Sequence, residues 1–277
     1  MTCIVCRQLA PRLGDLAANR AVSLGAIREA VDAGADVVVL PELVTSGYVF
    51  ERADEAVAAA IPRTDPLFAE WAAEAARGAA VVVGGFCERG DDGHVYNSAA
   101  LVDGTGVRAV HRKTHLWDRE KLWFRPGDAP PPVVDTAVGR IGMLICYELE
   151  FPELTRQLAL AGADLLAVPT NWPLVERPPG EHPPEVLIGM AAARVNRMFV
   201  ACCDRTGAER GQEWTGGTTI IDEAGWVVAT QTGVGPASAE LDLARARDKR
   251  LTDLCDALGD RRPELYGALA GDPAAPR

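Results

Sequence analysis

A helix-and-strand unit occurs twice in this chain, and it constrains the fold more than any other feature. The segment REAVDAGADVVVLPEL at 28–43 resembles RQLALAGADLLAVPTN at 156–171, and the two Gly-Ala-Asp triplets lie 128 residues apart. In each copy Gly34 or Gly162 suits the left-handed position just after a helix. The runs DVVVL and DLLAV that follow are fully apolar, which is typical of strands buried on both faces. Unless the likeness arose by chance, the two units predict a sheet layered with helices and built from two related halves.

The remaining segments fit this layered arrangement. The sequences GDDGHVYN and DEAGW are typical of hairpin turns, because Asp-Gly and Ala-Gly supply positive φ angles. Five prolines at 171–185 predict an irregular loop over the sheet edge, so we expect one domain over residues 1–277. Besides the two repeated strands, we expect helices at 16–33, 66–77, 152–161, 185–196 and 242–258, and strands at 2–9, 79–87, 95–102, 107–113, 139–146, 197–204, 217–222, 226–231 and 237–241.

Composition limits the partners of the chain. The 277 residues are 48% hydrophobic, enough for an extensive core, and their formal net charge is −11. An acidic chain without a basic run is not expected to bind nucleic acid or an anionic membrane as its main partner. We see no secretory leader and no apolar run as long as a membrane span, and the seven cysteines are scattered. We therefore expect a cytoplasmic protein with reduced thiols.

Three polar residues directly follow apolar strands. Glu42 follows VVVLP, Lys113 ends VRAVHRK, and Cys146 ends GRIGMLIC. Each alone has an ordinary explanation, as a loop carboxylate, a strand-end charge and a packed core thiol. Ligands in open α/β sheets collect beyond the carboxyl ends of the strands, so the three side chains are candidates for one site. Together they supply a nucleophile, a base and a cation.

The sequence around these residues resembles the nitrilase superfamily of carbon–nitrogen hydrolases. LPELVTSGY, HRKTHLWDREKLWFRPG and ICYELEFPE are similar to the three signature blocks of that family, in its order Glu, Lys, Cys. The likeness continues through RVNRMFVACCDRTG, GGTTIID and DRRPELYG. The resemblance implies a four-layer α-β-β-α sandwich that pairs into a homodimer or larger homo-oligomer and needs no metal or cofactor. It also implies that the tail at 259–277 contacts a partner subunit.

The resemblance implies a role for each of the three residues, and the chemistry requires such roles. A thiol with a pKa of about 8.5 is mostly protonated at neutral pH, so Cys146 needs a base, which is Glu42 in this interpretation. The tetrahedral intermediate carries an oxyanion that needs donors already in place. Lys113 is expected to face that oxygen, with the backbone N–H of Tyr147 as a second donor.

A fourth catalytic residue is implied by the family, which carries a second glutamate before WFRPG. The spacing points to Glu120, seven residues after Lys113. Its expected role is to hold Lys113 and the substrate amide, and two carboxylates near one ammonium keep the lysine charged. Glu148, two residues past the nucleophile, is the rival for this role. An acidic residue there usually orders the local backbone in the family, so Glu120 is preferred.

Two short segments, at 146–153 and 169–173, indicate the substrate class. CYELEFPE and PTNWP are most similar to the aliphatic-amidase-like members, and true nitrilases usually carry tryptophan where this chain has Tyr147. The sequence therefore favours a small carboxamide that is hydrolysed to an acid and ammonia. N-carbamoyl compounds and nitriles stay open, as does a non-hydrolytic acyl-transfer or binding module. Tyr48, Tyr147, Asn171 and Trp172 are the expected substrate-binding residues, with packing on the rim as the alternative for Trp172.

Two other motifs suggest metal sites but lack the expected context. Cys3 and Cys6 form a C-x-x-C, yet residues three apart on a strand point to opposite faces. His111 and His115 lie on a strand end rather than in a helical H-E-x-x-H. We therefore expect no metal. Nor does the chain contain a G-x-S-x-G motif that would mark a serine nucleophile.

Overall fold

Two six-stranded sheets form the centre of the protein, and a computed structural model describes residues 1–267. The first sheet has the order β14-β1-β2-β3-β4-β5 and the second β13-β12-β9-β8-β7-β6. The first contains β1 (Thr2–Gln8), β2 (Val37–Val39), β3 (Val81–Arg89), β4 (Val95–Asp103), β5 (Gly106–Arg112) and β14 (Gly235–Leu241). The second contains β6 (Val133–Thr136), β7 (Gly139–Met143), β8 (Leu165–Pro169), β9 (Phe199–Cys203), β12 (Thr219–Ile221) and β13 (Val227–Thr230).

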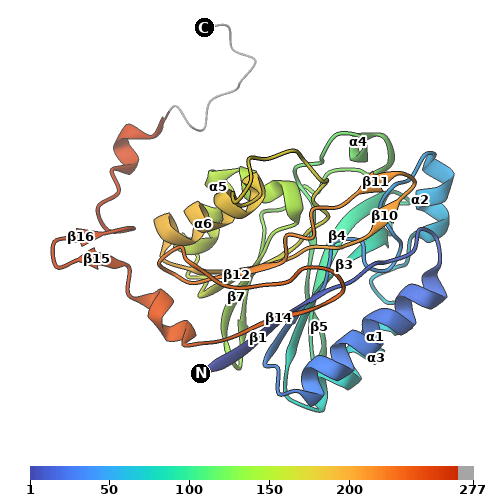
Figure 1. Ribbon diagram of the computed structural model, residues 1–277, viewed down its shortest axis with the longest axis horizontal. Helices are drawn as coiled ribbons and strands as arrows, with labels where there is room; N and C mark the ends of the chain where they lie inside the picture. The colour runs from blue at the N-terminus through green and yellow to red at the C-terminus, as the bar shows by residue number, and fades with distance from the viewer. Residues whose placement is uncertain (268–277) are drawn as a thin grey trace, which may run out of the picture.

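Helices cover the outer face of each sheet. On the first sheet lie α1 (Leu16–Asp32) and α3 (Pro66–Ala76), and on the second lie α5 (Pro152–Leu160) and α6 (Pro184–Asn196). Figure 1 shows the resulting order of helices, sheet, sheet and helices. The predicted four-layer α-β-β-α sandwich is therefore confirmed.

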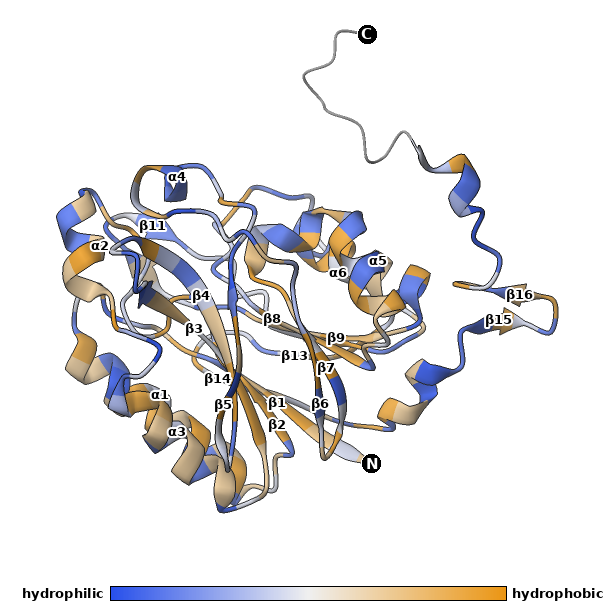
Figure 2. Ribbon diagram, turned by 180° about the vertical axis from the view of Figure 1, so that it is seen from behind, coloured by the Kyte–Doolittle hydropathy of each residue, from blue (hydrophilic) through white to orange (hydrophobic). Residues whose placement is uncertain are grey.

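Strand residues alternate between the layers. Val37 and Val39 pack between the two sheets, whereas Val38 packs under the helices of the first sheet. In the second sheet Cys203 faces the inter-sheet core and Cys202 faces the helices. Each sheet is thus apolar on both faces, as predicted for strands covered on both sides. Figure 2 shows these apolar strands in the interior and mixed, more polar helices outside.

The repeated unit has the same place in both sheets. Strand β2 pairs in parallel with β1 and β3, and β8 pairs in parallel with β7 and β9. Gly34 and Gly162 have φ angles of 87° and 85°, the left-handed conformation expected after a helix. The aspartate of each triplet accepts a hydrogen bond from a neighbouring strand: Asp36 from the N–H of Cys3, and Asp164 from the N–H of Arg140.

The helix expected at 242–258 was a wrong prediction. A short 3-10 helix, Leu243–Arg247, is followed by the hairpin of β15 (Arg250–Thr252) and β16 (Cys255–Asp256). The side chain of Asp242 caps the 3-10 turn at Ala244, and that of Asp248 accepts the N–H of Arg250. Such local bonds compete with a continuous helix. The buried apolar residues Leu243 and Ala246 both lie in the 3-10 turn, and none of residues 248–258 is buried to favour a longer helix.

Residues 248–267, here called the C-terminal arm, extend away from the sheets (Figure 1). The arm includes the 3-10 turn Pro263–Leu265. Residues 268–277 of the expected partner-contacting tail lie outside the described residues. Within the described part of the chain, no helix is both long and apolar enough to span a membrane. The elements without a counterpart in the prediction are β6, α2 (Ala53–Ala59), α4 (Glu120–Trp123), β10 (Ala208–Glu209) and β11 (Gln212–Glu213), and the hairpin β15–β16.

Candidate active site

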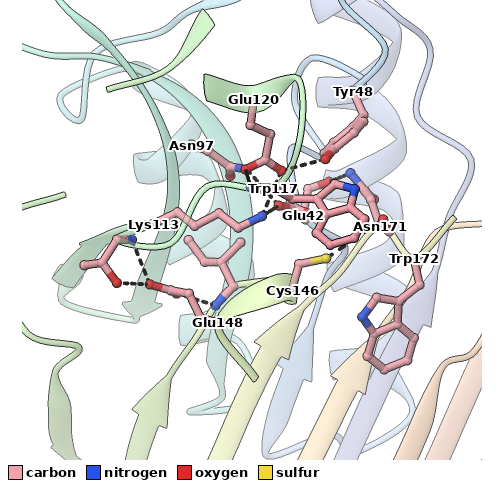
Figure 3. A network of polar contacts seen from close by, with 12 residues as sticks. Glu42, Tyr48, Asn97, Lys113, Trp117, Glu120, Cys146, Glu148, Asn171 and Trp172 are labelled. Atoms are coloured by element: carbon pink, nitrogen blue, oxygen red, sulfur yellow. Dashed lines mark hydrogen bonds and ion pairs between the residues drawn. The ribbon is translucent and has the colours of Figure 1, made fainter. Parts of the chain in front are cut away.

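Three charged side chains meet in the interior at the carboxyl ends of the strands. Glu42 lies three residues after β2, Lys113 directly follows β5, and Glu120 begins α4. The ammonium of Lys113 donates to Oε1 of Glu42 at 2.7 Å and to Oε1 of Glu120 at 2.8 Å. All three residues are at most 3% exposed. Buried charges need such pairing, and one ammonium here serves two carboxylates (Figure 3).

Burial and pairing set the ionisation of this group. Burial raises the pKa of Glu42 to about 7, even though Lys113 opposes the shift. Burial lowers the pKa of Lys113, but the carboxylates of Glu120 and Glu42 outweigh it and hold that pKa above its ordinary value. Lys113 is therefore a fixed positive charge, whereas Glu42 can gain or lose a proton near neutral pH. Oε2 of Glu42 is buried and has no hydrogen-bond partner among the described residues.

Cys146 lies beside this charged group. It begins the 3-10 turn η1 (Cys146–Glu150) between β7 and α5. Its φ angle is 50°, a left-handed conformation that a non-glycine residue rarely adopts and that is common at functional sites. Burial raises the pKa of its thiol well above the ordinary value, and the charge of Glu42 raises that pKa further. The thiol therefore keeps its proton until a base removes it.

The residues that follow the two repeated strands are hydrogen-bonded to each other at this site. The backbone N–H of Glu42, after β2, donates to the carbonyl of Thr170, after β8, at 3.4 Å. Nδ2 of Asn171 donates to the carbonyl of Glu42 at 3.0 Å, and the carbonyl of Asn171 lies 3.9 Å from Sγ of Cys146. Corresponding ends of the two halves thus hold Glu42 and Cys146 in one place.

Glu148 has a different environment from Glu120. Its carboxylate accepts the backbone N–H groups of Ile145 and Thr114, each at 2.8 Å, and the hydroxyl of Thr114 at 2.6 Å. His111 Nε2 lies 2.8 Å from Oε2. Burial alone would raise the pKa of Glu148, but these bonds lower it, so it is ionised. Glu148 therefore fastens the end of β5 to the turn that carries the nucleophile candidate.

Glu120 is held in place by Tyr48 and Trp117 as well as by Lys113. The hydroxyl of Tyr48 donates to Oε1 of Glu120 at 2.6 Å, and the N–H of Trp117 donates to Oε2 at 3.1 Å. Of the two candidates for the fourth catalytic position, Glu120 is hydrogen-bonded to Lys113, whereas Glu148 is bonded to backbone N–H groups, Thr114 and His111.

A cavity opens next to the thiol. It has about 390 Å³ of empty space, which includes open solvent at its mouth. Of the expected substrate-binding residues, Tyr147, Asn171 and Trp172 line this cavity together with Cys146. Tyr48 does not: it lies in a neighbouring cavity beside Glu120 and Trp214. Trp172 is buried at 3% exposure, so its ring belongs to the cavity wall.

Three further residues support the site and were missed by the sequence reasoning. Asn97 in β4 donates to Oε1 of Glu42 at 2.7 Å. Asp204, directly after β9, accepts the N–H of Trp172 at 2.9 Å, and Glu209 accepts the N–H of Tyr48 at 2.8 Å. The position of Asp204 after a buried strand is the signal already used for the other candidates. Asn97 is a polar residue inside an apolar strand, whereas nothing in the sequence around Glu209 marks it.

The described residues contain no group of three or more His, Cys, Asp or Glu side chains that could hold a metal ion. The carboxylates of Glu42 and Glu120 are instead hydrogen-bonded to Lys113, and the carbonyl of Asn171 lies near the thiol. A buried thiol, a carboxylate near its midpoint of ionisation and a fixed ammonium are the groups needed for nucleophilic attack on a carbonyl-like carbon.

Comparison with known proteins places the chain in a family. The sequence matches the family described as carbon-nitrogen hydrolase over residues 3–251. It is 36% identical over 265 residues to a nitrilase from Pyrococcus abyssi, covering 94% of this chain and 97% of the relative. It is 37% identical over 270 residues to an (R)-stereoselective amidase from a Pseudomonas species, covering 96% and 93%.

The fold is similar to solved structures of an amidase from Nesterenkonia sp. AN1. In one mutant of that amidase, acrylamide has added to the active-site cysteine; it is 27% identical, with a TM-score of 0.78 and coverage of 96% and 98%. Another mutant, in complex with butyramide, is 26% identical, with a TM-score of 0.76 and coverage of 96% and 95%. The family match, the similar fold and the active-site cysteine of the similar amidase lead to one conclusion. This chain belongs to the carbon–nitrogen hydrolase family of the nitrilase superfamily.

Proposed function

We propose that this protein hydrolyses a small carboxamide to a carboxylic acid and ammonia through a thioester on Cys146. The observation that carries the proposal is the grouping of this thiol, which lines the cavity, with the buried carboxylate of Glu42 and the buried ammonium of Lys113. Oε2 of Glu42 has no hydrogen-bond partner among the described residues, and the pKa of Glu42 is about 7. A base with that pKa is suited to taking a proton near neutral pH.

Acylation follows from these positions. Glu42 takes the proton of Cys146, and the sulfur attacks the carbonyl carbon of the amide. The oxyanion that forms is stabilised by the ammonium of Lys113, which the two carboxylates hold in its charged state, and by the backbone N–H of Tyr147. Glu42 then returns the proton to the amide nitrogen, the C–N bond breaks, and ammonia leaves. Glu120 holds Lys113 in position and contacts the substrate amide.

Deacylation reuses the same groups. Water enters where ammonia has left, Glu42 takes its proton, and the oxygen attacks the thioester carbon. The oxyanion again faces Lys113. Collapse of this second intermediate breaks the C–S bond, and the proton held by Glu42 returns to the sulfur. One amide and one water give one acid and one ammonia, and the thiol is restored.

Ammonia release from matched panels of amides, nitriles and ureido acids tests the proposal, with intact-mass detection of the acyl adduct. We expect amides to be the best substrates and Cys146→Ala to abolish both turnover and the adduct. Cys255→Ala is the matched control, because Cys255 is exposed in the C-terminal arm and should leave both unchanged. Turnover that survives in Cys146→Ala would eliminate the thioester mechanism.

A nitrile is the second candidate substrate. The Pyrococcus abyssi relative carries the name nitrilase, and a thiolate attacks a nitrile carbon as it attacks a carbonyl carbon. N-carbamoyl compounds and a non-hydrolytic acyl transfer are the remaining alternatives. In the same panel, a nitrile or ureido compound that releases ammonia faster than the corresponding amide would replace the amide as the substrate. An acyl adduct that forms without ammonia-releasing turnover would favour acyl transfer.

We also infer that two copies of the chain pair, and that the C-terminal arm takes part. The arm leaves several large apolar side chains in solvent, including Leu254 at 92% exposure and Leu265 at 65%. Exposed apolar groups on an extended segment are typical of an interface that is covered by a partner. The cytoplasmic location stays a prediction.

A further inference from the structure

The cavity beside Cys146 has an unusual balance of charge. Two carboxylates line it, Glu150 and Glu185, and among the residues described around it none is Lys, Arg or His. Apart from Cys146 and Asn171, the rest of the wall is aromatic or apolar, with the rings of Trp117, Tyr147 and Trp172. A neutral aliphatic amide does not require negative charge in this wall, and the partly buried carboxylate of Glu185 is costly without a partner.

The two carboxylates come from separate elements that meet at the cavity. Glu150 ends η1, the turn that begins with Cys146, and Glu185 lies in the first turn of α6. One carboxylate oxygen of Glu185, Oε2, is buried and has no hydrogen-bond partner among the described residues. A buried acceptor without a partner is uncommon in a folded protein, and a donor on a ligand would satisfy it.

The surroundings of both groups support this interpretation. Burial raises the pKa of Glu185, and it also raises the pKa of Glu150, to which the charge of Glu185 adds. Neither carboxylate forms an ion pair with a Lys, Arg or His side chain among the described residues, so a cation on a ligand would favour the charged form of both. The N-terminus of α6 favours an acidic residue at position 185, but it does not account for Glu150. The charge of Arg177 lowers the pKa of Glu185, yet no ion pair joins them in the described structure.

We propose that the substrate carries a cationic nitrogen on its acyl part, which Glu185 and Glu150 bind while Cys146 attacks the amide carbonyl. This rests on the proposed function and names its substrate class: short-chain amides that end in a protonated amine. The rings of Tyr147 and Trp172 add to the recognition, because aromatic faces attract cations. The cavity excludes an amide that ends in a carboxylate by like-charge repulsion.

A charge series of amides tests the substrate class. The probes have equal chain length and end in an ammonium, a methyl or a carboxylate group, for example 5-aminopentanamide, hexanamide and the monoamide of adipic acid. We expect kcat/KM to be about tenfold or more higher for the ammonium amide than for the methyl amide, the size of one charge-assisted hydrogen bond. The carboxylate amide is expected to be the poorest substrate of the three.

Variants assign the preference to the two carboxylates. Glu185→Gln should reduce the ratio of kcat/KM between ammonium and methyl amides about tenfold, and Glu150→Gln should reduce it less, because Glu150 is exposed. Glu185→Lys should reverse the order and favour the carboxylate amide. Glu153→Gln is the matched control, since it removes an exposed glutamate on α5 outside the cavity, and the ratio should not change.

The outcomes separate this inference from the function on which it rests. A charge preference that disappears in Glu185→Gln supports the inference, and a reversed preference in Glu185→Lys supports it independently of any loss of stability. Equal kcat/KM for the ammonium and methyl amides overturns the substrate class and leaves amide hydrolysis intact. Absence of turnover with all three amides, in protein whose fold is verified by circular dichroism, overturns the proposed function itself.

Discussion

Glu42 is a carboxyl group that its surroundings keep close to half ionisation at neutral pH. Burial favours its protonated form, while Lys113 and the amide of Asn97 favour its charged form. The balance differs from that of Glu148, which accepts several hydrogen bonds and has a lowered pKa. One buried carboxyl group can therefore exchange a proton at neutral pH and the other cannot, which suits a base and a structural anchor respectively.

This difference predicts the pH dependence of acylation. The base must be deprotonated, so kcat/KM should fall about tenfold per pH unit as the pH decreases below the pKa of Glu42. We expect this acid limb near pH 7, the value set by burial. A pH–rate profile with a neutral amide measures it.

Two variants link that limb to Glu42. Asn97→Leu removes a hydrogen bond that stabilises the charged carboxylate, so it should move the acid limb to higher pH. Glu42→Gln should abolish acylation while the protein stays folded. An acid limb near pH 4, or normal acylation in Glu42→Gln, would remove Glu42 from the role of base.

The turn between β7 and α5 is the element that presents the thiol. Cys146 is held at a φ of 50°, which costs about 1 kcal/mol or more for a non-glycine residue. The carboxylate of Glu148 accepts the N–H of Ile145 just before the turn and two bonds from Thr114 beyond β5. Together these bonds hold the strained turn against the strand end that carries Lys113.

The two glutamates should therefore differ when each loses its charge. Glu148→Gln weakens several buried hydrogen bonds, so we expect a loss of about 1–3 kcal/mol of stability and a lower Tm. Glu120→Gln leaves the turn intact but weakens the hold on Lys113, so we expect kcat/KM to fall at least about a hundredfold with a smaller change in Tm. Thermal melting and kinetics on both proteins measure this. A greater loss of activity in Glu148→Gln at a temperature where it is folded would show that the roles are reversed.

The elements that were predicted correctly have a strong local signal in the sequence. The two Gly-Ala-Asp units and their buried strands were predicted because a helix stop, an apolar run and a proline follow one another in each. Glu42, Lys113 and Cys146 were chosen because each follows such a strand, and the structure brings all three together. The family resemblance supplied Glu120, which no strand pattern marks.

Other parts of the molecule depend on contacts that the sequence does not display. The predicted helix at 242–258 failed because its aspartate side chains bond locally and because none of residues 248–258 is buried. The support that Glu209 gives to Tyr48 joins residues 161 positions apart. Tyr48 was expected at the pocket wall, but the path of the loop after β2 directs its hydroxyl to Glu120 instead. Such pairings are set by tertiary packing rather than by neighbouring residues.

At the scale of the whole molecule, the C-terminal arm is the segment whose exposed apolar side chains are not covered by contacts within one chain. It lies outside the four layers, and Leu254 is almost fully exposed. In a free monomer the apolar side chains of Leu254 and Leu265 would stay in solvent. Association of two copies would cover it.

Light scattering on the full chain and on a version that ends at residue 248 tests this. We expect the full chain to have about twice the 29.5 kDa mass of one copy, and the shortened chain to shift toward a single copy. A control in which Leu254→Asp and Leu265→Asp are introduced together should shift the mass in the same direction. A full chain that runs as a clean 29.5 kDa species would contradict the dimer.

The proposed nucleophile and its base are rooted in different sheets. Glu42 follows a strand of the first sheet and Cys146 follows a strand of the second, and cross-links from Thr170 and Asn171 join them at the rim. The packing of the apolar core between the two sheets therefore sets the distance between the sulfur of Cys146 and the carboxylate of Glu42. Slippage of one half of the molecule past the other would separate them while leaving each half correctly folded, so catalytic alignment is a property of how the halves are stacked.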